Sequence, residues 1–415
     1  MRRLILSIVA TTAAIAVTVS AADWPQYLGP ERNGIYRGPA IADTFPAGGP
    51  KVVWRKTIGQ GFAGPAVAGN RVLIFHRVKN EEVLESLDPA TGMSQWRYAY
   101  PTTYRDDFGF DAGPRAVPVV AGGIVYTFGA EGQLHAVDLV KGTRLWSVDT
   151  MRRFNVAKGY FGAGGSPLVE NGRVIANIGG EKAGIVAFDA KTGMELWTAT
   201  QDAASYSSGV AATIGGRRLG VFLTREGLVG LDPMSGHIEF QQRWRARAAA
   251  SVNAASPVIV GDQIFVSAEY GPGAGVLQVA GSKLTPLWSS DEVLSNHYAT
   301  SIYYNGTLYG FHGRQEYGPS FRAVDFKTGK VLWDQDQFRG GSVILANDRL
   351  VILRESGELM IAPASPQAFK PSARAQVLRG VARPYPALAD GFLYARTERD
   401  ERTEESTLVC LDLRR

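Results

Sequence analysis

Polar and aromatic side chains that could bind a ligand gather in short segments between apolar runs, such as SYSSG (205–209), SNHYATS (295–301) and FHGRQEYGPS (311–320). Arginine offers a planar fork of N–H donors to carboxylates, and tyrosine offers a flat ring. We therefore predict a site for a small anionic or hydroxyl-rich ligand, or for a periplasmic protein partner. The candidate residues are Arg115, Tyr206, Trp244, Asn253, His297, Tyr298, His312, Arg314, Glu316, Tyr317 and Arg354.

Other chemistry is not favoured by the sequence. The five histidines show no metal-ligand spacing, so no zinc site is predicted. Three aspartates crowd residues 106–111 and could bind calcium, but they lack the Gly and terminal Glu of an EF-hand loop, and no metal site is assigned. GAGG (162–165) precedes a strand, so it is not a phosphate loop, and Ser166 and Ser256 lack an esterase elbow.

A repeated eleven-residue sequence, called the phrase below, indicates the strands that position these segments. AVDLVKGTRLW (136–146), AFDAKTGMELW (187–197) and AVDFKTGKVLW (323–333) are near copies, and three weaker copies end at 96, 240 and 288. With Trp54, the aromatic anchors lie 42, 50, 51, 43, 48 and 45 residues apart, the period of a β-propeller blade. The anchors are Trp54, Trp96, Trp146, Trp197, Phe240, Trp288 and Trp333.

Each unit is expected to form four strands, with the phrase spanning the turn between the third and the fourth. Its Asp accepts bonds from nearby backbone N–H groups, its Gly supplies positive φ, and its Trp packs on the neighbouring blade. The segments 340–362 and 385–413 complete a seventh and an eighth unit. The last unit lacks a fourth strand, whereas KVVWRKTI (51–58) is a fourth strand without a blade, so we predict that the two pair and close the ring.

In such a ring, the loops from fourth to first strands and from second to third strands emerge on one face. The candidate residues belong to these loops, so we expect them around one mouth of the central channel. A glutamate recurs in the second-to-third loops, at Glu131, Glu181, Glu226, Glu269, Glu316 and Glu355. The alternative is that these loops are polar because they are solvated, and that the glutamates reflect repeat ancestry.

The first 22 residues have the order of a secretory signal: Arg2 and Arg3, an apolar run, and then small residues. The alternative, an uncleaved membrane anchor, is disfavoured because the run is short and rich in Ala and Thr. We expect a soluble periplasmic or secreted protein that does not span the membrane after cleavage and is not a lipoprotein. The net charge of +5 falls to +3 without the signal, which does not indicate nucleic-acid binding, and Cys410 is the only cysteine.

Together with DWPQYLGPERNGIY (23–36), the phrases over residues 50–415 resemble the tryptophan-docking repeats of the pyrroloquinoline quinone (PQQ) dehydrogenases and BamB-like scaffold proteins. The resemblance implies an all-β, eight-bladed propeller of four-stranded blades over 51–415, after a signal peptide (1–22) and a lead-in segment (23–50). For the enzymes it also implies a vicinal cysteine pair, a tryptophan beneath PQQ, and a calcium site. Cys410 alone cannot supply the pair, and only Trp244 is a spare tryptophan inside the array.

Two functions therefore follow from the sequence. The first is an exported propeller that binds a ligand or a protein through one channel mouth without catalysis. The alternative is a PQQ- and calcium-dependent oxidoreductase acting on an alcohol or a sugar, in which the quinone takes up hydride. The missing cysteine pair favours the first.

Overall fold

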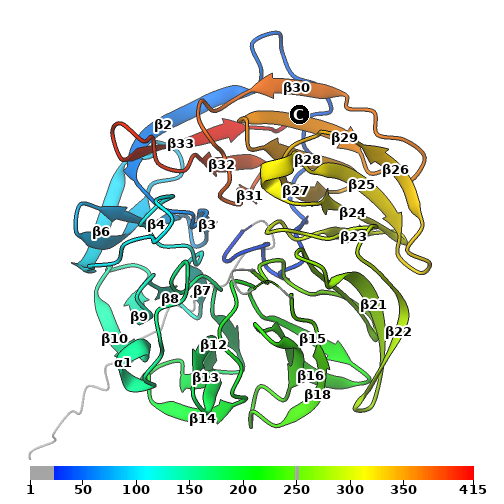
Figure 1. Cartoon of the computed structure of the whole chain (residues 1–415). Helices are drawn as coiled ribbons and strands as arrows, with labels where there is room; N and C mark the ends of the chain where they lie inside the picture. Colours follow the sequence, from blue (N-terminus) through cyan, green and yellow to red (C-terminus); the bar gives the residue numbers. More distant parts are fainter. Residues whose placement is uncertain (1–22, 247, 249–251) are drawn as a thin grey trace, which may run out of the picture.

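The computed structural model describes residues 23–415 except 247 and 249–251, and the predicted signal peptide lies outside these residues. Eight sheets within the described chain, antiparallel apart from one added parallel strand, stand in a ring around a central channel (Figure 1). The predicted eight-bladed, all-β propeller is confirmed. The described helical elements are α1 (Thr150–Arg153) and a 3₁₀ turn (Gln315–Tyr317).

The first four blades follow one another along the chain, each running from an inner to an outer strand. Their strands are β3 (Ala66–Val67), β4 (Val72–Val78), β5 (Glu81–Leu87), β6 (Ser94–Pro101); β7 (Val119–Ala121), β8 (Ile124–Phe128), β9 (Gln133–Asp138), β10 (Arg144–Asp149); β11 (Leu168–Glu170), β12 (Arg173–Gly180), β13 (Ala183–Asp189), β14 (Glu195–Ala199); and β15 (Val210–Ile214), β16 (Arg217–Leu223), β17 (Gly227–Leu231), β18 (Ile238–Arg243).

The remaining four blades complete the ring. Their strands are β19 (Val258–Val260), β20 (Gln263–Ala268), β21 (Gly273–Ala280), β22 (Lys283–Ser290); β23 (Ile302–Tyr304), β24 (Thr307–His312), β25 (Ser320–Asp325), β26 (Val331–Gln335); β1 (Ile35–Tyr36), β27 (Gly341–Ala346), β28 (Arg349–Arg354), β29 (Glu358–Pro363), β30 (Ala373–Gln376); and β31 (Ala387–Ala389), β32 (Phe392–Arg396), β33 (Glu405–Asp412), β2 (Lys51–Gly59).

The ring closes where the sequence predicts. Strand β2 pairs antiparallel with β33 along its whole length, and Trp54 stands opposite Cys410. One blade is thus built from both ends of the propeller, so the edge of β33 is covered and the chain ends are held in the sheet.

The repeated phrase docks each blade on the next. Trp146 of β10 donates its indole N–H to the carbonyl of Ala190 (3.0 Å), in the turn of the following blade. Its ring lies against Gly193 of that turn, where φ is +73° and an added Cβ would come 2.7 Å from the indole. The carboxylate of Asp189 closes the turn by accepting from the N–H groups of Lys191 and Thr192. Equivalent indole bonds are made by Trp54, Trp96, Trp197, Trp288 and Trp333.

The lead-in segment 23–50 packs into the propeller. Strand β1 pairs in parallel with β27 as a fifth strand, and the segment enters the centre of the ring (blue in Figure 1). Arg32, which is 3% exposed, reaches two blades by donating to the carbonyls of Ser166 (3.3 Å) and Gly209 (2.8 Å). Within the described residues, no helix has the length and apolar character needed to cross a bilayer.

Candidate functional site

A cavity of about 280 Å³ opens at one end of the central channel. Seven of the eight loops that join an outer strand to the next inner strand contribute to its wall, for example through Phe62, Tyr206 and Arg383, and the remaining blade contributes through Gly341 and Ser342 at the start of β27. Second-to-third loops add Tyr270 and Glu316, so both predicted sets of loops meet at one mouth. The volume lies at the small end of ligand pockets.

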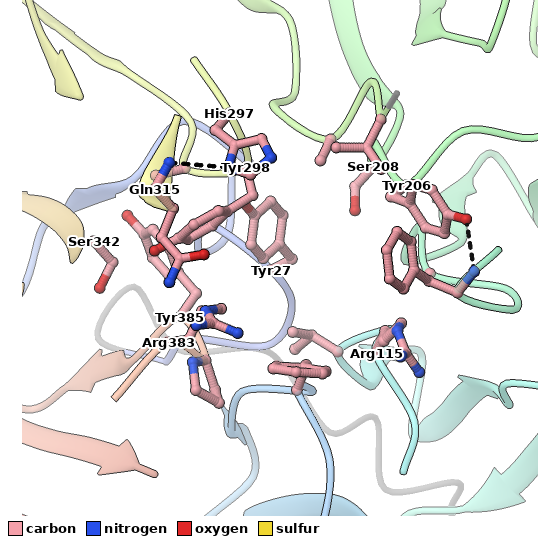
Figure 2. Close-up of a pocket in the computed structure, with 18 of the residues that line it drawn as sticks. Tyr27, Arg115, Tyr206, Ser208, His297, Tyr298, Gln315, Ser342, Arg383 and Tyr385 are labelled. Atoms are coloured by element: carbon pink, nitrogen blue, oxygen red, sulfur yellow. Dashed lines mark hydrogen bonds between the residues drawn. The ribbon is translucent and has the colours of Figure 1, made fainter. Parts of the chain in front are cut away.

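Five of the candidate residues line this cavity: Arg115, Tyr206, His297, Tyr298 and Glu316. Figure 2 shows Arg115 and Tyr206 on one side, with His297 and Tyr298 across the cavity from them. These residues come from four different loops, so the ring topology, rather than proximity in sequence, brings them together.

Two candidates lie outside the cavity, next to its lining residues. The guanidinium of Arg314 lies between the rings of Tyr270 (4.8 Å) and Tyr317 (5.1 Å) and pairs with Glu316 (3.0 Å). Tyr317 is 72% exposed. Both residues therefore shape the loop that carries Glu316 and do not line the cavity wall.

Two further candidates hold loops from behind. Asn253 is buried; its side chain donates to the carbonyl of Thr224 (2.8 Å), and its own carbonyl accepts the N–H of Tyr206 (3.0 Å). His312 accepts the N–H of Ser295 on Nδ1 (3.0 Å), and burial lowers its pKa to about 4. Asn253 and His312 therefore position the loops of Tyr206 and His297 without lining the cavity.

The last two candidates are packing residues. Trp244 is buried in an inter-blade core and donates its indole N–H to Gly273 (3.2 Å). It was singled out as a spare tryptophan because Phe240 occupies the phrase position of its blade, but it too is held by the next blade. Arg354 pairs with Glu358 (2.6 Å) and stacks on Phe338 (4.9 Å).

Sequence reasoning missed several lining residues. Tyr27 comes from the lead-in segment, which has no repeat to align, and its hydroxyl bonds to that of Thr300 (3.2 Å). Phe62 and Arg383 lie in outer-to-inner loops that were not among the segments selected for polar character. Applying the loop rule to every blade junction would have included Phe62 and Arg383.

Aromatic rings form most of the wall. Eight line the cavity among the described residues: Tyr27, Phe62, Phe110, Phe161, Tyr206, Tyr270, Tyr298 and Tyr385. Several tyrosine hydroxyls are already engaged by the protein: that of Tyr206 accepts the N–H of Phe161 (2.9 Å), that of Tyr298 donates to Glu355, and that of Tyr385 donates to the carbonyl of Val343. The rings are thereby fixed in place, and their faces are the surface available to a ligand.

Two guanidinium groups flank one of these rings. Arg115 lies 5.3 Å and Arg383 lies 5.6 Å from the centroid of Phe62, and Figure 2 shows them on opposite sides of the cavity. Arg115 pairs with buried Asp106 (2.7 Å), and Arg383 pairs with both Glu355 (2.9 Å) and Glu398 (3.0 Å). Their charge is therefore compensated, although a guanidinium has five N–H donors and each retains some for a ligand.

His297 is neutral and fully engaged. Burial lowers its pKa to about 4. Its Nδ1 accepts the N–H of Gln315 (3.3 Å, dashed in Figure 2), so the proton of the neutral ring is on Nε2 and is donated to the hydroxyl of Tyr270 (2.8 Å). Neither nitrogen is left as a metal ligand.

The carboxylates of this face brace loops. Glu131 accepts from Thr102 (2.8 Å) and Thr103 (2.7 Å), and Glu355 holds Tyr298, Gln315 and Arg383. The three crowded aspartates are also occupied: Asp106 by two backbone N–H groups and Arg115, Asp107 by Lys158, and Asp111 by the N–H groups of Gly61 and Gly113. No group of three His, Cys, Asp or Glu residues suited to a metal ion occurs in the described part of the chain.

The sequence profile of a PQQ-repeat family described as outer membrane protein assembly factor BamB matches residues 79–335. The chain belongs to this family. Its fold is similar to that of BamB from Moraxella catarrhalis (TM-score 0.60, 14% identity, 87% of this chain and 99% of that one). It is also similar to quinohemoprotein alcohol dehydrogenase from Comamonas testosteroni (TM-score 0.64, 14% identity, 95% and 81%).

One sequence relative is the quinohemoprotein alcohol dehydrogenase ADH-IIG of Pseudomonas putida, 38% identical over 122 residues. The match covers 28% of this chain and only 16% of that longer protein. The proteins that the chain resembles thus include an outer membrane protein assembly factor and quinohemoprotein alcohol dehydrogenases, and family membership shows the fold and the repeat.

The wall residues do not fit calcium-bound PQQ. Glu316 is the one carboxylate that lines the cavity among the described residues, and it is paired with Arg314. A calcium ion needs several converging oxygen ligands, mostly carboxylates. PQQ is itself a polycarboxylate, and the two arginines that would face it are already paired with Asp106 and Glu355.

Proposed function

We propose that this protein is an exported binding module that takes a small, neutral, hydroxyl-bearing ligand into the channel-mouth cavity and performs no chemistry on it. Sugars and polyols are the matching class, since flat rings pack against their C–H faces and arginine N–H groups donate to their oxygens. The proposal rests chiefly on one observation: both lining arginines are already paired with carboxylates.

Charge balance separates the two ligand classes that the sequence left open. An anion placed beside Arg383 would also lie near Glu355, whose charge repels it, and a neutral hydroxyl has no such penalty. The cavity therefore favours hydroxyl-rich ligands over anionic ones. Because the lining carboxylate of Glu316 is paired with Arg314 and both ring nitrogens of His297 are engaged, we assign no catalytic residue.

The second candidate is a PQQ-dependent oxidoreductase, favoured by the 38% identity to a quinohemoprotein alcohol dehydrogenase over part of the chain. In that case the quinone would supply hydride uptake. The carboxylate set for calcium is not found among the described residues, so this candidate ranks second.

One experiment separates the two functions. The purified protein is titrated calorimetrically with neutral hexoses, pentoses and polyols and with the matching uronic and aldonic acids. In parallel it is incubated with PQQ and calcium and assayed for thermal stabilisation and dye reduction. Binding of neutral sugars in preference to their acids, with no PQQ response, is the expected result. Stabilisation by PQQ with turnover would overturn the proposal.

Export is a separate element of the proposal, supported by the charged, apolar and small-residue order of residues 1–22. We infer a soluble protein in the periplasm or medium. N-terminal sequencing of the protein from fractionated cells should give a mature chain that begins near residue 22. A full-length chain in the cytoplasmic fraction would refute export.

A further inference from the structure

Exposed aromatic residues concentrate beside the cavity. Among the described residues, the large apolar side chains that are exposed include four aromatic ones, and all four belong to loops on the cavity face: Phe108 (49%), Phe110 (53%), Tyr160 (42%) and Tyr317 (72%). The others are aliphatic, and most of them belong to docking turns or outer strands. An exposed patch of rings next to a pocket is characteristic of a binding surface.

Three of these rings continue the cavity wall outward. Phe161 is 5.6 Å from Tyr206 inside the cavity and 5.0 Å from Phe108, which in turn is 6.0 Å from Tyr160, as measured between ring centroids. Phe110 joins the same group at 6.3 Å from Phe161. We call Phe108, Phe110, Tyr160 and Phe161 the aromatic rim; it forms an unbroken path of rings from the cavity to solvent.

The loop that carries Phe108 and Phe110 is held by many bonds. Asp106 accepts the N–H groups of both phenylalanines (3.0 and 3.1 Å), and Arg399 donates to the carbonyls of Gly109 (2.7 Å) and Phe110 (2.5 Å). Lys158 ties the neighbouring loop to the same segment. The rings are thus held out in water by a fixed framework, which favours a preformed binding surface over chance exposure.

We propose that the natural ligand is the end of a neutral oligosaccharide, with its terminal unit in the cavity and the following units on the aromatic rim. This inference rests on the proposed function. Beside the rim, Lys158 is paired with Asp107 (2.6 Å) and Arg399 is bonded to loop carbonyls, so the surface favours flat neutral faces over charge. The rim consists of loops and offers no strand edge to a peptide.

The test measures how binding affinity depends on the length of the sugar chain. Neutral sugars built from glucose, mannose, galactose, xylose or N-acetylglucosamine are titrated as monomers, dimers, tetramers and hexamers. The series that binds as a monomer should bind about three- to ten-fold tighter per added unit over the first two or three units, and then level off. The double variant Phe108→Ser/Tyr160→Ser removes two rim rings that do not line the cavity.

This variant should lose most of the gain with length while its monomer affinity stays within two-fold of the parent. Met93→Ser/Met194→Ser, which alters exposed apolar residues on docking turns, is the matched control and should behave as the parent. Monomer binding without a gain with length overturns the inference and leaves the proposed function standing. Absence of binding by every sugar at every length overturns both. Binding of a proline-rich peptide that the double variant abolishes would assign the rim to a protein partner instead.

Discussion

Replacing Gly193 by Ala tests the docking contact that sets one blade against the next. A Cβ at Gly193 would stand 2.7 Å from the ring of Trp146, and φ there is +73°. Gly172, in the same blade, has the same φ of +73° but nothing within 4 Å of its Cβ position. Gly172→Ala is therefore a matched control that carries the backbone strain without the clash.

The two variants differ by a calculable amount. A left-handed backbone costs alanine about 1–2 kcal/mol, and the stiffer unfolded chain returns about 0.4–1 kcal/mol, so Gly172→Ala should lower the free energy of unfolding by about 1 kcal/mol. Gly193→Ala adds about 1–3 kcal/mol for overpacking against Trp146. We expect a total loss of about 2–4 kcal/mol for Gly193→Ala.

Urea unfolding, followed by tryptophan fluorescence and by circular dichroism, measures the difference. Coincident transitions would justify a two-state analysis, and equal slopes would show that the same surface is exposed on unfolding. A Gly193→Ala loss no greater than that of Gly172→Ala would refute the view that this glycine is required by the docked tryptophan. A larger loss for Gly172→Ala would contradict it even more directly.

Two other predictions concern the cavity. Tyr206→Phe should keep sugar affinity within two-fold and lower the free energy of unfolding by about 1 kcal/mol, because only the bond to the Phe161 N–H is removed. Tyr206→Ala, which removes the ring, should weaken sugar binding several-fold. Equal weakening by both variants in calorimetry would show that the hydroxyl, not the ring, contacts the ligand. Burial raises the pKa of Glu398 to about 7, with Arg383 opposing the shift and Glu355 adding to it. Between pH 4.5 and 7 the folded carboxyl therefore keeps a proton that the unfolded chain releases, so stability should fall by about 1–3 kcal/mol as pH rises through 7. Glu398→Gln should flatten that decline in urea titrations, and an unchanged slope would refute the assignment.

The fold could be predicted because its determinants are local and repeated. The Asp and Gly of each phrase form their turn from neighbouring atoms, and the Trp needs only the next copy of that turn, as with Trp146 and Gly193. Closure of the ring by β2 could also be predicted, because the N-terminal end of the array had a strand without a blade and the C-terminal end had a blade without its fourth strand.

The sequence could predict which face of the propeller carries the site, but not which residues line the cavity. Which loop residues point inward depends on contacts between distant loops, such as Asn253 with the N–H of Tyr206. Tyr27 was out of reach because the lead-in segment has no counterpart in the repeat, and its place in the channel depends on Arg32 bonding to two blades. Trp244 shows the opposite error, in which an exception to the repeat suggested a ligand contact but reflects inter-blade packing.

The recurring glutamates link the repeated fold to the properties of the candidate site. Had the loop carboxylates converged on the channel, the mouth would offer the oxygen cluster that calcium requires. Instead Glu131 accepts from the loop at Thr102, Glu226 pairs with Arg243 and Arg245, and Glu355 holds Tyr298 and Arg383. These three carboxylates fix neighbouring segments, and the result is a rigid aromatic wall with balanced charge. Selectivity at such a wall must come from the spacing of its rings and the direction of its remaining N–H donors, which is why ligand shape and length, more than charge, are the variables to test.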